Sequence, residues 1–155
     1  MFDTVFRIIL CPQRMKKLAT KLREAQLFAH AAHNLVHGTS FFADHEFLGE
    51  AYEAYTKAYD ETIERMIGLD EEVNPLLITS DAATSANETF HVRRMDSYEM
   101  FYALIGLEKE ICQLVKETIE AGVSHGTSNL LEGFADHSEV RQYKIAQRIL
   151  WTQLN

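Results

Sequence analysis

The chain contains few of the residues that interrupt or cross-link a polypeptide. Its 155 residues include two prolines, seven glycines and two cysteines. An all-β fold needs turn residues at intervals of roughly 8–12 residues, so this scarcity favours long helices instead. Cys11 and Cys112 are too few for a disulfide framework and too far apart for a thiolate metal motif. We expect both to be reduced thiols.

Long apolar runs and an excess of positive charge are missing as well. No segment approaches the roughly 20 consecutive apolar residues that cross a bilayer, and the first ten residues lack the cleavage pattern of a secretion signal. The formal net charge of −8, from 15 Lys and Arg against 23 Asp and Glu, disfavours a surface that wraps polyphosphate. These absences predict a cytoplasmic protein with no membrane segment and without strong DNA binding.

The apolar residues that are present recur at helical spacing. The first such stripe predicts a helix over residues 12–37, with Pro12 in its first turn and Gly38 as its end. A second helix follows the connection 38–40, whose hydroxyl groups can cap it, and ends near Gly68. Its apolar stripe consists of Leu48, Tyr52, Tyr55, Tyr59, Ile63 and Met66.

The second half of the chain repeats this arrangement after a long connection. Residues 69–95 break the helical spacing with Pro75 and the polar stretch 79–88, and they have room for one short helix. A third helix starts at Asp96 or Ser97 and ends at Gly122, and a fourth follows Gly126, with a cap among residues 127–129, and runs towards Leu150. Two helical hairpins joined by one long crossover predict an all-α, ferritin-like four-helix bundle in a single domain spanning residues 1–155.

Four side chains of the first hairpin have the chemistry of metal ligands. Asp60 and Glu64 are four residues apart, so both carboxylates project from one face of the second helix. His33 and His45 flank the tight turn between the two helices, where their imidazoles can converge. Mixed imidazole and carboxylate ligation suits iron, and also zinc or manganese. The pattern therefore predicts a metal site with room for an oxidant.

These four ligands cannot meet within one subunit. His45 and Asp60 are separated by 15 residues of helix, which is about 22 Å at about 1.5 Å per residue, whereas a metal–ligand bond is roughly 2 Å. One site that uses all four residues needs a second copy of the chain, with its second helix antiparallel to the first. A two-fold axis near Glu53 produces this arrangement and creates two identical sites per dimer.

The same segment resembles a known family. The segment from His33 to Leu69 is similar to the ferroxidase region of Dps, the DNA-binding protein from starved cells, a miniferritin. The matching residues are His33, Gly38, Phe41, the pair His45-Glu46, Asp60 and the pair Glu64-Arg65. Residues 129–136 resemble the fourth helix of that family more loosely. The resemblance implies a hollow dodecamer that oxidises ferrous iron at two-fold interfaces, usually with hydrogen peroxide, and stores ferric mineral. It implies catalytic roles for His33, His45, Asp60 and Glu64, with Glu64 as a bridge between metals.

One ligand of that family is absent. The Asp that usually follows the second His by one helical turn is replaced by Gly49. Glu53 lies one turn further along the same stripe and is a better geometric substitute than Glu50, and we include it among the predicted metal ligands. His30 and His37 share a face of the first helix with His33, so either imidazole can compensate as well.

Two further departures concern radicals and DNA. Asn34 stands where the family commonly has a Trp, so we expect no aromatic ring beside the iron. The Lys-rich tail that often binds DNA in this family is replaced by a segment in which only Arg7 is basic. The small basic cluster at Lys16, Lys17, Lys21 and Arg23 is interpreted as a balance for neighbouring acids.

Two other functions remain open. A bacterioferritin-like protein would hold a di-iron centre inside each bundle with Glu-x-x-His pairs, and only the segment from Glu88 to His91 has that spacing. A non-catalytic helical shell or adaptor with a degenerate metal site would explain Gly49. The oxidant, peroxide or oxygen, and the route by which iron reaches the site are left open.

Overall fold

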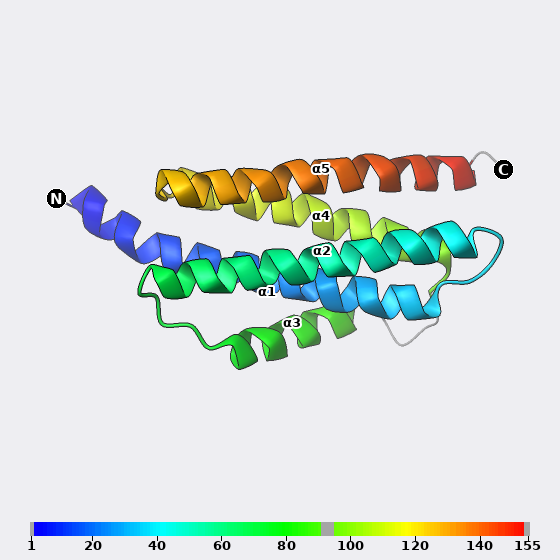
Figure 1. Cartoon of the computed structure of the whole chain (residues 1–155), viewed down its shortest axis with the longest axis horizontal. Helices are drawn as coiled ribbons and strands as arrows, with labels where there is room; N and C mark the ends of the chain where they lie inside the picture. Colours follow the sequence, from blue (N-terminus) through cyan, green and yellow to red (C-terminus); the bar gives the residue numbers. More distant parts are fainter. Residues whose placement is uncertain (1, 91–94, 154–155) are drawn as a thin grey trace.

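The structure is a computed structural model that describes residues 2–90 and 95–153, and their side chains within 12–90 and 95–150. It consists of five helices and, over the described residues, no strand, which confirms the all-α prediction (Figure 1). In the described part of the chain, none of these helices is long and apolar enough to cross a membrane. The helices are α1 (Phe2–Leu35), α2 (Phe41–Gly68), α3 (Pro75–Thr89), α4 (Ser97–Glu120) and α5 (His125–Gln153).

Four of these helices form the expected bundle. α1 lies against α2, and α4 lies against α5, so each consecutive pair is an antiparallel hairpin (Figure 1). α1 also contacts α4, which joins the two hairpins. The short α3 is the helix within the crossover and lies along the outer side of α1 (Figure 1). The ferritin-like bundle with one long crossover is therefore confirmed.

The core is built from the apolar stripes that the sequence shows. Every residue that defines the first stripe is buried, and these are Met15, Leu18, Leu22, Ala25 and Ala29. They share one core with Leu48, Tyr55 and Met66 of α2 and with five buried residues of α4, which are Met100, Leu104, Leu107, Ile111 and Val115. Burial of one large apolar side chain contributes roughly 1.5–3 kcal/mol. The aligned stripes consequently fix which face of each helix points inwards.

Helix α1 differs from the prediction at both ends. It begins at Phe2, ten residues before the predicted start, and Pro12 lies inside it. Proline has no N–H to donate to the carbonyl one turn earlier, but its fixed φ is compatible with helix, so the helix continues through it. At the other end α1 stops at Leu35, two residues earlier than expected. His37 therefore lies beyond the helix and does not share a helical face with His33.

Polar side chains cap the starts of α3, α4 and α5, but not that of α2. Asp96 and Glu99 form a capping box at the start of α4, and Asn74 accepts two backbone N–H groups at the start of α3. Ser40 is the N-cap residue of α2, but its hydroxyl makes no capping hydrogen bond. Helix α5 begins at His125, earlier than predicted, because the Ser124 hydroxyl accepts the N–H of Thr127 at 3.2 Å. Gly126 is consequently inside the helix.

Candidate metal centre

The first half of the candidate centre is a pair of histidines at the α1–α2 turn. His33 lies in the last turn of α1 and His45 in the first turns of α2. Between them Gly38 has a φ of +98°, a left-handed conformation that suits glycine and allows the short turn. The imidazole centroids lie 3.7 Å apart with ring planes tilted by 36°. The structure therefore brings these two predicted ligands together, and we call them the histidine half-site.

The orientation of His33 is fixed by a hydrogen bond. Its Nδ1 lies 2.9 Å from the main-chain carbonyl oxygen of His45. A carbonyl oxygen only accepts hydrogen bonds, so Nδ1 must carry the proton and donate it. In the neutral ring, Nε2 then keeps its lone pair. Metal-binding histidines commonly have this arrangement, with the other ring N–H donating a hydrogen bond to a backbone carbonyl. His33 is thus held with Nδ1 engaged by the main chain and Nε2 free to bind a metal.

Aromatic rings surround the half-site, contrary to the expectation drawn from Asn34. The ring of Tyr52 lies edge-on to His33 at 5.4 Å and close to His30 at 4.7 Å. Phe41 lies 5.1 Å from the ring of His45. The expectation was wrong because these rings come from α2, whereas the residue that follows His33 in α1, Asn34, is exposed. Two aromatic side chains therefore restrict the movement of the imidazoles.

Gly49 lies directly beside the histidine half-site. A Cβ atom at this position would be 3.4 Å from both Cε1 and Nδ1 of His33. A side chain here would thus extend alongside the imidazole. Gly49 therefore leaves the histidine half-site without a carboxylate at the position next to His33, where a side chain could supply a third metal ligand.

The second half of the candidate centre is the pair Asp60 and Glu64 near the other end of α2. Both side chains are exposed and lie on the same face of the helix. Glu64, together with Glu61 and Arg65, lines an open pocket of about 370 Å³. We call Asp60 and Glu64 the carboxylate half-site. Its oxygens are accessible to a metal ion or to a second subunit.

The two half-sites do not meet within the chain. Helix α2 is continuous from Phe41 to Gly68, so His45 and Asp60 are held about 22 Å apart by the helical rise. Among the described side chains, within residues 12–90 and 95–150, no three His, Cys, Asp or Glu residues are grouped so that they could hold a metal ion. Each half-site alone offers two ligands.

The candidates for the missing ligand occupy different places. His30 is exposed on α1 and contacts Tyr52, whereas His37 follows the helix and its Nδ1 lies 3.1 Å from the carbonyl of Leu35. Glu50 and Glu53 are exposed on α2, away from the bundle core. Completion of the site by Glu53, or by His30, His37 or Glu50, therefore stays a prediction.

Comparison with known proteins identifies the family. The sequence profile of the ferritin-like domain matches residues 13–152. The chain belongs to the ferritin-like family. A search of curated proteins gave no match.

Solved structures of Dps proteins share this ferritin-like fold. Dps from Thermosynechococcus elongatus has a TM-score of 0.81 at 18% identity, over 96% of this chain and 95% of that one. The archaeal Dps homologue from Halobacterium salinarum has a TM-score of 0.80 at 20% identity, over 92% and 81%. Dps from Microbacterium arborescens, in its high iron form, has a TM-score of 0.81 at 14% identity, over 94% and 95%. The resemblance to Dps is thus confirmed in the fold.

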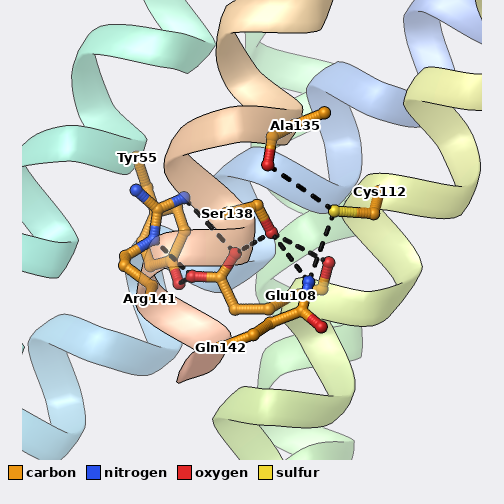
Figure 2. Close-up of polar contacts among 7 residues, drawn as sticks. All are labelled: Tyr55, Glu108, Cys112, Ala135, Ser138, Arg141 and Gln142. Carbon is orange, nitrogen blue, oxygen red and sulfur yellow. Dashed lines mark hydrogen bonds and ion pairs between the residues drawn. The ribbon is translucent and has the colours of Figure 1, made fainter. Parts of the chain in front are cut away.

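The interior of this ferritin-like bundle holds a buried ion pair. Glu108 of α4 is 0% exposed and accepts hydrogen bonds from Tyr55 of α2 and from Ser138 and Arg141 of α5 (Figure 2). The Arg141 guanidinium also lies 4.8 Å from the centroid of the Tyr55 ring. Burial raises the pKa of the Tyr55 phenol well above its usual range. We call these four residues the Glu108 network.

The Glu108 network bears on the bacterioferritin-like alternative. A di-iron centre inside the bundle needs carboxylates that are free to bind metal, whereas both oxygens of Glu108 accept hydrogen bonds and its charge is balanced by Arg141. Glu88 is exposed on α3, and His91 lies outside the described residues. Glu108, the buried acid of α4, is therefore committed to hydrogen bonds and an ion pair within the bundle.

The basic cluster of α1 is partly engaged with acids of the same chain. Lys21 forms ion pairs with Glu24 at 2.6 Å and with Glu110 at 2.7 Å. Arg23 lies over the ring of Tyr59 at 5.1 Å. The two ion pairs of Lys21 are those expected of a residue that balances neighbouring acids, whereas Arg23 contacts an aromatic ring.

Sequence reasoning missed the roles of two residues, Tyr52 and Glu108. Tyr52 was assigned only to the apolar stripe of the second helix, although its position three residues after Gly49 and seven after His45 places it beside them. Glu108 was not singled out, yet it is an acid four residues after buried Leu104. A charged residue within an apolar stripe is the signal that would have identified it.

Proposed function

We propose that this protein oxidises ferrous iron at sites formed between two subunits, and that its homo-oligomer stores the ferric product in a hollow shell. The observation that carries the proposal is the arrangement along α2. One end presents two imidazoles, with His33 oriented by its Nδ1 hydrogen bond so that Nε2 is free, and the other presents two exposed carboxylates. Two copies related by a two-fold axis near Glu53 would combine these halves into two complete sites.

The ligands suit the chemistry of iron oxidation. Imidazole nitrogen and carboxylate oxygen together bind ferrous iron and stabilise the additional charge of ferric iron. With hydrogen peroxide as oxidant, two ferrous ions each give one electron, and peroxide takes up two protons to form two waters. Glu64, as a bridge, would hold the two metals close together. Zinc or manganese could occupy the same ligands.

The family supports this assignment. The chain has the ferritin-like domain and the Dps fold, and the Microbacterium arborescens Dps with that fold was solved in a high iron form. We propose a dodecameric shell without strong DNA binding, because the net charge of −8 disfavours phosphate. A cytoplasmic location fits the free thiol of Cys112.

Complementation between inactive variants tests the intersubunit site. His45→Ala removes one half-site and Asp60→Ala the other, so each variant alone should oxidise iron slowly. In a random 1:1 mixture half of the dimers contain both variants, and each of these has one intact site of two. The mixture should therefore recover about a quarter of the wild-type rate of ferrous oxidation by peroxide.

Controls separate this result from general damage. His137→Ala and Glu72→Ala change exposed residues outside both half-sites, and they should leave the rate unchanged. Subunit exchange is verified by native mass spectrometry with one variant isotopically labelled. Exchange without recovery of activity would contradict the intersubunit site. Repeating the wild-type assay with oxygen instead of peroxide identifies the oxidant.

Gly49 favours a second candidate, a shell without ferroxidase activity. The residue leaves no carboxylate beside His33, so the site has one fewer ligand than its counterpart in the family. A wild-type protein that assembles but does not accelerate ferrous oxidation would support this candidate.

A further inference from the structure

The outward face of α2 carries an unusual sequence of side chains. Eight residues spaced by three or four positions form a single exposed line, and we call it the α2 stripe: Phe42, Glu46, Glu50, Glu53, Lys57, Asp60, Glu64 and Ile67. The six inner members comprise five carboxylates and one lysine, a net charge of −4. The two outer members are apolar. A stripe of this kind is acidic in the middle and hydrophobic at both ends.

The apolar ends are not explained by a solvated helix face. Phe42 is 86% exposed and Ile67 is 57% exposed. Contact of these apolar side chains with water is unfavourable, so burying them would stabilise the protein. The point midway between them along α2 falls between Ala54 and Tyr55. The point midway between His45 and the Asp60/Glu64 pair falls between Glu53 and Ala54. Two independent pairs of residues thus indicate the same two-fold centre to within one residue.

This coincidence identifies a second copy of the chain as the partner of the stripe. With two antiparallel α2 helices centred there, Phe42 of each subunit would cover Ile67 of the partner subunit. Glu50 would lie opposite Lys57 of the partner subunit, since these two residues are equally distant from the same centre. Lys57 is available for this, because its contact with Glu61 in its own chain is long, at 3.9 Å, and exposed.

The remaining charges oppose the same contact. Two stripes together carry a net charge of −8, twice the −4 of one, and Glu53 of each subunit would lie near the axis and near its symmetry mate. Like charges brought together at a partly desolvated interface repel one another. The carboxylate half-sites are part of this charge. Divalent cations bound there would reduce the repulsion at the same positions where they link the two subunits.

We infer that assembly through the α2 stripe is controlled by divalent metal, so that the metal-free chain dimerises weakly and metal binding drives dimer formation. The inference rests on the intersubunit site of the proposed function and adds a regulatory consequence to it. A metal that binds the complete site and neither half-site alone stabilises the dimer by mass action. Iron would therefore promote the assembly that oxidises it.

The dimerisation constant of the protein with and without zinc tests this inference. Zinc has no redox chemistry, so assembly is observed without turnover. The full chain, labelled with a fluorophore and stripped with EDTA, is diluted to nanomolar concentration at low ionic strength and measured by sedimentation velocity with fluorescence detection. At free zinc of ten times its dissociation constant, each site should tighten the dimer about 10-fold, and two sites about 100-fold. Added salt alone should tighten the metal-free dimer by screening the repulsion.

Substitutions in the stripe separate repulsion from ligation. Glu53→Gln should tighten the metal-free dimer, whereas Glu139→Gln, a matched change at an exposed position of α5, should not. His45→Ala should abolish the zinc effect without changing the metal-free constant. Lys57→Glu should weaken the dimer, and the double variant that also carries Glu50→Lys should restore it, because the pair is reversed with no change in net charge.

Two outcomes would overturn the inference. One is a metal-free protein that stays assembled to the same dilution as the zinc-loaded protein. The other is a Glu53→Gln variant that behaves like Glu139→Gln. Either result combined with normal peroxide-dependent iron oxidation leaves the proposed function intact. A wild-type protein that neither oxidises iron nor dimerises more tightly with zinc would instead contradict the intersubunit site itself.

Discussion

The α-carbon of Gly49 faces the imidazole of His33 so closely that a methyl group there would lie 3.4 Å from both Cε1 and Nδ1. That distance is an ordinary van der Waals contact, so a Cβ atom can be added without displacing the ring. A longer side chain would pass along the edge of the imidazole. The position therefore allows a direct test of the missing ligand.

Gly49→Asp should strengthen metal binding at the histidine half-site. The new carboxylate would lie next to His33 and supply an oxygen ligand, and a gain of about tenfold in affinity corresponds to about 1.4 kcal/mol. Zinc titration by calorimetry measures the affinity, and stopped-flow absorbance measures the rate of ferrous oxidation by peroxide. Both should increase.

Gly49→Ala and Gly49→Asn are the matched controls. Alanine should raise the free energy of unfolding by about 0.5–1 kcal/mol, because glycine is unfavourable inside a helix, and it should not change zinc affinity. Asparagine has the shape of aspartate without its charge. Equal gains from asparagine and aspartate would show that packing, not the carboxylate, is responsible.

Tyr52→Ala should weaken zinc binding by about tenfold or more, since loss of groups that orient a ligating histidine costs about 10–100-fold in affinity. The ring of Tyr52 contacts both His30 and His33, and alanine removes this support. Tyr52→Phe keeps the ring and should bind zinc like the wild type. If Tyr52→Phe binds zinc as weakly as Tyr52→Ala, the hydroxyl group, and not the ring, supports the histidines. Tyr102→Ala, at an exposed tyrosine of α4, controls for the substitution itself.

Arg141→Met should lower the free energy of unfolding by about 3–5 kcal/mol, because it leaves Glu108 buried without a balancing charge. Urea unfolding followed by circular dichroism measures the loss. The double variant Glu108→Gln with Arg141→Met removes both charges and should recover most of it. A double variant no more stable than Arg141→Met would show that hydrogen bonds, and not the unpaired charge, dominate the cost.

Stability should fall above about pH 10 through Tyr55. The phenol has a pKa near 10 in an unfolded chain, and burial raises the pKa in the folded protein. Above pH 10 the folded state therefore holds a proton that the unfolded state has lost, so rising pH favours unfolding. The contribution is complete below pH 10 and disappears as the pH approaches the folded-state pKa.

Tyr55→Phe isolates this contribution. At pH 7 the variant should be less stable by about 1–3 kcal/mol, because Glu108 loses a hydrogen-bond donor. Above pH 10 its stability should decline less steeply than that of the wild type. Tyr143→Phe changes an exposed tyrosine and should keep the wild-type slope. Parallel slopes for wild type and Tyr55→Phe would contradict the assignment to Tyr55.

The bundle could be predicted from the sequence because burial and local capping determine it. The stripe from Met15 to Ala29 and the capping box of Asp96 are both readable from neighbouring residues, and both are present. Pro12 was misplaced because proline suits both the first turn of a helix and an interior position where one hydrogen bond is given up. Only the residues upstream decide between the two, and their apolar run was too short to indicate a helix.

The candidate site was predictable where it depends on short-range spacing along the chain, within one helix or across a tight turn. The facing of His33 and His45 follows from the short turn, and the exposure of Asp60 and Glu64 follows from their position on α2. The contacts of Tyr52 with His30 and of Glu108 with Arg141 depend on how different helices align. That alignment is a property of the packed bundle and is not encoded in any single segment.

The Glu108 network has a consequence for the axial position of α2. Its hydrogen bonds join α2, α4 and α5 at one level of the bundle, and Tyr55 lies between the two half-sites (Figure 2). A slip of α2 by one turn, about 5.4 Å, would separate Tyr55 from Glu108 and leave buried groups without partners. The network therefore fixes the axial position of α2 relative to α4 and α5. It sets the height at which every subunit presents its histidines and carboxylates to a neighbour.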